Sequence, residues 1–122
     1  MNPYVRWMWT SALRAKGLYK QGKGALRHTD EEMSACCLGV LCDLAVKHGV
    51  IPPPRKAFHD VNTLTGYRIM EVFEYGENGD HSILPHEVID WSGLPTGNPY
   101  VAVLNDHGTP FGVIADIIDG DY

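Results

Sequence analysis

The sequence has no long apolar run and no signal-peptide core. Crossing a bilayer takes roughly 18 consecutive apolar residues, and charges are spaced through the N-terminal stretch MNPYVRWMWTSALRAKG. We therefore expect no membrane partner and a reducing compartment, in which the three cysteines stay as thiols. Internal repeats and low-complexity tracts are also absent, and a chain of 122 residues fits one domain, residues 1–122.

Each end of the chain lacks charge of one sign. Residues 1–29 contain six basic side chains and no acidic one, whereas residues 69–122 contain ten acidic side chains and neither Lys nor Arg. Two interpretations are open: the ends pair across the fold or are separately solvated, or the basic end forms a face for an anionic ligand. The net charge of −5 argues against generic DNA binding, because that binding depends on neutralising phosphates.

The clearest local signals in the sequence are those of helices. A helix is predicted over residues 3–16, because Asn2 can cap its start and Gly17 suits its end. A second helix is predicted within residues 29–49, where acids precede an apolar stretch and a glycine follows it. Asp43 is the one charge in the middle of that stretch, and a helix that is apolar almost all round lies at the centre of a fold.

The rest of the chain predicts shorter elements. Residues 84–94 favour one short helix, and two helical pieces are expected on either side of Gly108. Residues 50–60, VIPPPRKAFHD, are predicted to be an irregular surface connection of polyproline type, because consecutive prolines remove hydrogen-bond donors. Residues 66–80 predict a strand entering a hairpin, with a return strand at residues 81–83. The expected fold class is α+β: a mainly helical single domain with a central buried helix and a small antiparallel sheet or hairpins.

The three cysteines lie together in the stretch ACCLGVLCDLA. Neighbours on a helix point about 100° apart, and no second pair of metal ligands follows, so we expect neither a metal nor another cofactor. Cys36 or Cys37, near a helix N-terminus, is a candidate nucleophile with His107 as its base. The apolar surroundings favour the alternative that Cys36, Cys37 and Cys42 fill a packed core, with Gly39 admitting a neighbouring backbone.

The basic stretch RAKGLYKQGKGALR, residues 14–27, is the better candidate for a binding site. Its glycines permit turns with outward-pointing N–H groups, its cations attract anions, and its tyrosine and glutamine suit a base. It lacks the strand–loop–helix context of a nucleoside triphosphatase phosphate loop, and a solvated hairpin is the alternative. The candidate ligand-binding residues are Arg14, Lys16, Tyr19, Lys20, Gln21, Lys23 and Arg27.

Several motifs, taken in order, resemble a group of small proteins from actinobacterial phages and bacterial genomes. These motifs are YKQGKGALR, CCLGVLCDLA, LPHEVIDWSGL and LNDHGTPFGVIADII, and the resemblance covers most of the chain. It implies a phage or prophage gene expressed in the cytoplasm of a host bacterium. It implies no particular activity, cofactor or catalytic residue.

These observations predict a non-enzymatic binding protein of phage type. It would act on the host by sequestering a small anionic ligand, such as a nucleotide defence signal, or by docking on a host protein. Two alternatives stay open. One is a cysteine-dependent hydrolase that uses Cys36 or Cys37 with His107, and the other is a homo-oligomeric interaction module joined through the opposite charges of its two ends.

Overall fold

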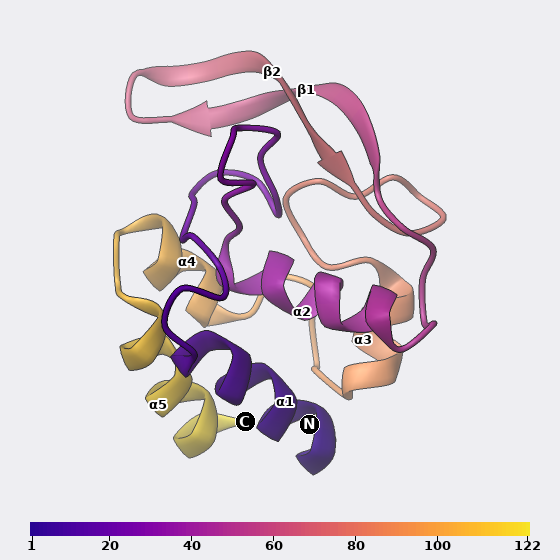
Figure 1. Cartoon of the computed structure of the whole chain (residues 1–122), viewed down its shortest axis with the longest axis vertical. Coiled ribbons are helices and arrows are strands. Elements are labelled where there is room, and N and C mark those ends of the chain that lie inside the picture. Colours follow the sequence, from indigo (N-terminus) through magenta and orange to yellow (C-terminus); the bar gives the residue numbers. More distant parts are fainter.

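The computed structural model describes residues 1–122 as five helices and one two-stranded antiparallel sheet, which confirms the predicted α+β class. The elements are α1 (Pro3–Arg14), α2 (Cys37–Lys47), β1 (Arg55–Thr63), β2 (Gly66–Glu74), α3 (His86–Ser92), α4 (Tyr100–Asp106) and α5 (Phe111–Asp121). In Figure 1, α2 runs through the middle of the molecule, α1 and α5 lie below it, and the hairpin of β1 and β2 lies above it. None of the five helices has the length and hydrophobicity needed to cross a bilayer.

The first helix begins where its capping residues predict. The Asn2 side-chain oxygen accepts hydrogen bonds from the backbone amides of Tyr4 at 2.9 Å and Val5 at 3.1 Å. These bonds satisfy two of the donors that every helix N-terminus leaves free. The helix ends at Arg14, two residues before the predicted end, and Gly17 follows with a φ of 77°.

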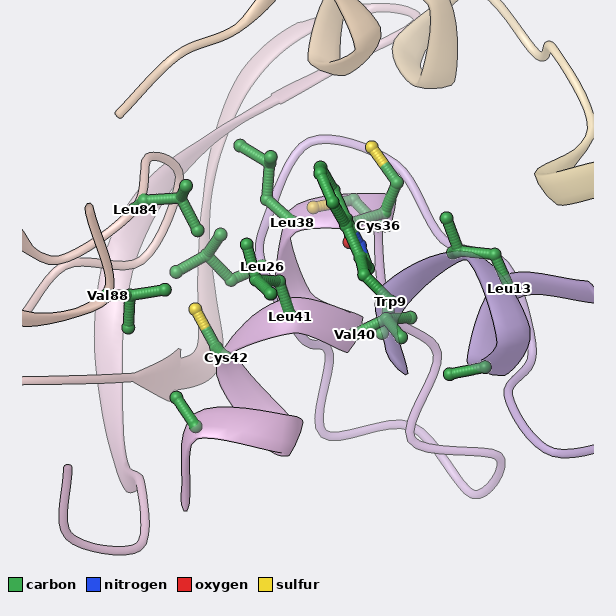
Figure 2. Close-up of a cluster of buried hydrophobic side chains, with 14 of the residues drawn as sticks. Trp9, Leu13, Leu26, Cys36, Leu38, Val40, Leu41, Cys42, Leu84 and Val88 are labelled. Carbon is green, nitrogen blue, oxygen red and sulfur yellow. The ribbon is translucent and has the colours of Figure 1, made fainter. Parts of the chain in front are cut away.

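The core is built around α2, and the three cysteines belong to it. Cys37 and Cys42 are fully buried, Cys36 is 6% exposed, and all three are free thiols. Figure 2 shows Cys36 and Cys42 among the apolar side chains of this cluster, and the indole N–H of Trp9 donates to the Cys37 carbonyl at 2.8 Å. The cysteines act as small apolar side chains in a packed interior, as the sequence favours.

Gly39 is the point at which a second backbone touches α2. A Cβ atom at this position would lie 1.7 Å from the carbonyl oxygen of Leu26. No side chain fits in that space, so the predicted close approach of another backbone is confirmed. The contact holds the loop between α1 and α2 directly against the central helix.

The prediction for residues 50–60 is wrong from Arg55 onward. Those residues begin β1, which pairs with β2 in a register running from Arg55 opposite Glu74 to Thr63 opposite Gly66. The three prolines that suggested an irregular connection end immediately before the strand. Proline restricts itself and the residue before it, and it places no restriction on the residues that follow.

The strand predicted in residues 66–80 exists, but its partner precedes it in the chain. The expected return strand at residues 81–83 does not form, and a single bridge joins Tyr75 to Asp80 around the turn at Gly79. The partner strand β1 begins directly after the prolines and carries mostly polar and charged residues. Its sequence therefore lacks the apolar alternation that identifies a half-buried strand.

The hairpin is attached to the segment between α1 and α2, residues 15–36, which we call the glycine loop. The backbone amide of Phe73 donates to the Arg27 carbonyl at 3.1 Å, and the Thr29 hydroxyl donates to the Glu71 carbonyl at 3.0 Å. A small apolar cluster of Ala25, Val61 and Val72 joins the same segments. The glycine loop itself forms isolated bridges rather than a hairpin of its own.

Candidate anion-binding site

Two cavities open between the hairpin, the glycine loop and the end of α4. The larger one, about 590 Å³, we call the basic cavity, because Lys23, His28, Arg68 and His107 line it. The smaller one, about 330 Å³, we call the acidic cavity, because it has two aspartates and neither Lys nor Arg in its wall. The two cavities share three wall residues, Gly24, Asn62 and Asp106.

Gly24 holds the hairpin and the glycine loop together at the boundary between the cavities. Its φ is 82°, and a Cβ atom there would lie 2.4 Å from the carbonyl oxygen of Asn62. Its backbone amide donates to the Asp106 carboxylate at 3.2 Å. Only glycine combines this backbone conformation with so close a contact, so three separate segments meet at one residue.

The side chain of Asn105, the residue before Asp106, holds the glycine loop in place. Its side chain is fully buried, accepts from Gln21 Nε2 at 3.0 Å and from the Cys37 amide at 3.1 Å, and donates to the Gly22 carbonyl at 2.8 Å. Cys36 provides no side-chain cap for α2, so Asn105 satisfies that helix start from another element. The hydrogen bonds of Asn105 therefore tie the glycine loop, which forms part of the cavity wall, to the core helix α2.

The basic cavity contains positive charge that no acid of the protein neutralises. Five of the ten Lys and Arg side chains, outside this cavity, form ion pairs with Asp or Glu. Lys23 and Arg68 form none, and both are exposed. The one acid in the wall, Asp106, already accepts the Gly24 amide. An anion in this cavity would form charge-assisted hydrogen bonds without displacing an internal partner.

The structure brings one of the seven sequence-predicted ligand residues, Lys23, into the basic cavity. Arg14 binds Asp116 and Asp119 on α5, each at 2.8 Å. This pairing joins the two ends of the chain, which is the first of the two interpretations of the charge distribution. The homo-oligomer alternative needs opposite charges of the two ends to pair between copies of the chain, and Arg14, Asp116 and Asp119 already pair within one copy.

The other predicted residues lie elsewhere on the glycine loop. Lys20 pairs with Glu32 at 3.6 Å, and Lys16 is exposed outside both cavities. Gln21 is held by Asn105 and by the Thr109 carbonyl, to which its Nε2 donates at 2.8 Å. These side chains therefore do not converge on one ligand with Lys23.

Tyr19 and Arg27 serve the attachment of the loop to α2. The Tyr19 hydroxyl donates to the carboxylate of Asp43, and Arg27 reaches the same carboxylate at 3.3 Å. Burial, and then the hydrogen bond with Asp43, raise the pKa of Tyr19 well above its ordinary value. Asp43, the one acidic residue of α2, thus anchors two side chains that the sequence suggested as ligand contacts.

Three residues of the basic cavity were missed by sequence reasoning: His28, Arg68 and His107. Arg68 is the last basic residue before the stretch that lacks Lys and Arg, which was the one available signal. The sequence suggests His107 only as a base for a thiol. It lines the basic cavity, whereas Cys36 lines the acidic cavity.

The electrostatics of the cysteines do not resemble those of an activated nucleophile. Burial raises the pKa of Cys36 to about 11 and the pKa of Cys37 well above its ordinary value. Reactive cysteines have a lowered pKa, because the thiolate is the attacking species. These properties fit the packed core.

The fold and site together define an α+β domain in which a β-hairpin and a glycine-containing loop enclose a basic cavity. A family model described as a domain of unknown function (DUF8296) matches residues 1–122, and the chain belongs to this family. No curated protein and no solved structure matches the chain.

Proposed function

We propose that the protein is a non-enzymatic binding protein that holds a small phosphate-bearing anion in the basic cavity. The observation that carries this proposal is the pair of unpaired cations, Lys23 and Arg68, which come from different segments and line one cavity. Most cations on a protein surface are solvated or paired with a neighbouring acid. Two that share a cavity without an acidic partner are arranged as an anion-binding site would be.

The chemistry of the wall supports a phosphate group. An arginine guanidinium offers paired N–H donors to two phosphate oxygens, and a lysine ammonium adds a compact charge. Thr63, Thr65 and Asn62 add hydroxyl and amide groups to the same wall. A volume of about 590 Å³ falls within the range of roughly 300–1,000 Å³ that small-molecule sites occupy.

The biological setting that we propose comes from the motif resemblance. A phage or prophage protein in the bacterial cytoplasm would use this cavity to sequester an anionic signal of the host, which makes an anti-defence role the natural setting. Docking on a host protein is the other way in which such a protein acts on its host. The cavity favours the small ligand, because its cations lie in a concave wall rather than on a flat face.

Isothermal titration calorimetry tests the proposal with inorganic phosphate, pyrophosphate and a panel of linear and cyclic nucleotides. We expect at least one of them to bind, and we expect Lys23→Ala and Arg68→Ala each to weaken binding by about tenfold or more. Lys16→Ala and Lys56→Ala are matched controls, since both lysines are exposed, unpaired and outside the two cavities. Lys20→Ala tests a residue that the sequence suggested as a ligand contact but that lines neither cavity, so we expect it to leave binding unchanged.

Two results would overturn the proposal. One is the absence of binding to every anion tested. The other is binding that survives both cavity variants or falls equally in the control variants, because the affinity would then come from general charge. Circular dichroism of each variant checks that the fold is retained.

A further inference from the structure

The acidic cavity adjoins the basic cavity but offers a different kind of chemistry. Its wall contains Asp60 and Asp106, together with Ser82 and Asn98, and no Lys or Arg. Ala25, Leu38 and Ala102 add an apolar part to the same wall. A phosphate group would be repelled here, so this cavity does not simply extend the anion site.

The two cavities are neighbours, because each includes Gly24, Asn62 and Asp106 in its wall. The contact between Gly24 and the Asn62 carbonyl forms their boundary. A ligand with a phosphate beside Lys23 and Arg68 therefore has a second cavity within the reach of its other end. The other end of such a ligand must donate hydrogen bonds to carboxylates and must pack against apolar side chains.

Two flat rings, those of Tyr67 and His81, stand in the wall of the acidic cavity. The His81 ring stacks on the ring of His59, with centroids 3.9 Å apart and planes 9° from parallel. Burial, and then the neighbouring His59, lower the pKa of His81 and so favour its neutral imidazole. Flat rings of this kind offer stacking surfaces to a planar group.

The wall also distinguishes between neutral and charged occupants. Asp60 and Asn98 are exposed side chains with oxygens that accept hydrogen bonds from N–H donors. A cationic amine would meet the carboxylates but would lose its hydration against the apolar floor. A planar, uncharged group rich in N–H donors satisfies the acceptors, the rings and the floor together.

We propose that the acidic cavity binds the nucleobase of a nucleotide whose phosphate lies in the basic cavity. This inference rests on the proposed function, since it takes the phosphate site as given. It adds a second site with its own residues: Asp60 and Asn98 accept hydrogen bonds from the base, and Tyr67 provides a stacking surface. The ligand class thereby narrows from small anions to nucleotides.

Calorimetry with three kinds of probe separates the two cavities. Inorganic phosphate and ribose 5-phosphate report on the basic cavity alone, whereas the four common nucleoside monophosphates report on both. We expect at least one nucleoside monophosphate to bind about tenfold more tightly than ribose 5-phosphate. Asp60→Ala and Asn98→Ala should abolish this gain without weakening the binding of ribose 5-phosphate. Asn78→Ala, at an exposed turn outside both cavities, is the matched control.

The outcomes distinguish the two proposals. If phosphate and ribose 5-phosphate bind but no nucleotide binds more tightly, the base site is overturned and the anion site stands. The same conclusion follows if the gain survives both Asp60→Ala and Asn98→Ala. If Arg68→Ala leaves every affinity unchanged, the anion site fails and the base site fails with it.

Discussion

The side-chain oxygen of Asn105 accepts a hydrogen bond from the backbone amide of Cys37, the first residue of α2, at 3.1 Å. The same buried side chain holds Gln21 and the Gly22 carbonyl. One residue of α4 thus caps the central helix and fixes the loop that carries Lys23. This arrangement links the stability of the core to the geometry of the candidate site.

Replacing Asn105 with Ala should lower the free energy of unfolding by roughly 3 kcal/mol. The substitution leaves the buried amide of Cys37 and the part-buried carbonyl of Gly22 without their partner, and an unsatisfied buried group costs roughly 1–3 kcal/mol. Urea denaturation measures the change. Asn98→Ala, at an exposed position with no side-chain hydrogen bond, should change stability by no more than about 0.5 kcal/mol. Equal losses in the two variants would contradict the role assigned to Asn105.

Gly39→Ala should destabilise the protein by about 3 kcal/mol or prevent folding. The added methyl group would lie 1.7 Å from the Leu26 carbonyl, so backbone must move before it fits. Gly112→Ala is the matched control, because Gly112 also lies in a helix but has open space around its Cβ position. There the change should be neutral or stabilising by up to about 1 kcal/mol. A thermal melt of both variants shows the contrast.

The three thiols should react slowly with an aromatic disulfide reagent in the native protein at neutral pH. Cys37 and Cys42 are fully buried, and although Cys36 lines the acidic cavity, it is only 6% exposed and its raised pKa, about 11, leaves very little thiolate. All three should react quickly once the protein is unfolded in urea. A native thiol that reacts as fast as free cysteine would support the hydrolase alternative and contradict the packed-core assignment.

Stability should fall as the pH rises from about 9 toward 11. The folded state keeps the proton of Cys36 up to a pKa of about 11, whereas the unfolded thiol releases it near its ordinary value of 9.0. Its contribution is therefore complete below pH 9 and is lost through this window, by roughly 3 kcal/mol in total. Urea titrations across the window measure the slope. Cys36→Ala should make the slope shallower, and an unchanged slope would refute the assignment.

Gly24→Ala should abolish anion binding while the helices remain. The substitution places a methyl group 2.4 Å from the Asn62 carbonyl and so separates the hairpin from the glycine loop. Gly17→Ala controls for backbone strain, because Gly17 has a similar φ of 77° but nothing near its Cβ position. Calorimetry with inorganic phosphate should show binding in Gly17→Ala and none in Gly24→Ala. Retained binding in Gly24→Ala would mean that the cavity does not depend on this contact.

Features encoded within a few residues could be predicted from the sequence. Asn2 and Pro3 start α1 through hydrogen bonds that span only three residues, so the local signal is sufficient. The apolar composition of α2 likewise predicts its central position. The glycine inside this helix predicts the backbone that touches it, since few other causes favour glycine there.

Features that depend on distant segments could not be predicted. The strand β1 is mostly polar and is recognisable only through its pairing with β2. The basic residues between Arg14 and Arg27 look like one patch in the sequence, but Asp43, Glu32 and the acids of α5 pair with several of them. Arg68 joins Lys23 only because the hairpin folds back over the loop. The sequence shows which charges exist but not which of them lack partners.

The hairpin provides walls for both cavities, yet it is fastened to the rest of the molecule through the glycine loop. A ligand that touches both segments adds its binding free energy to that fastening. Ligand binding should therefore slow the hydrogen exchange of the backbone amides in β1 and β2, while the exchange rates of α2 hardly change. The hairpin would then serve as a built-in indicator of whether the protein is loaded.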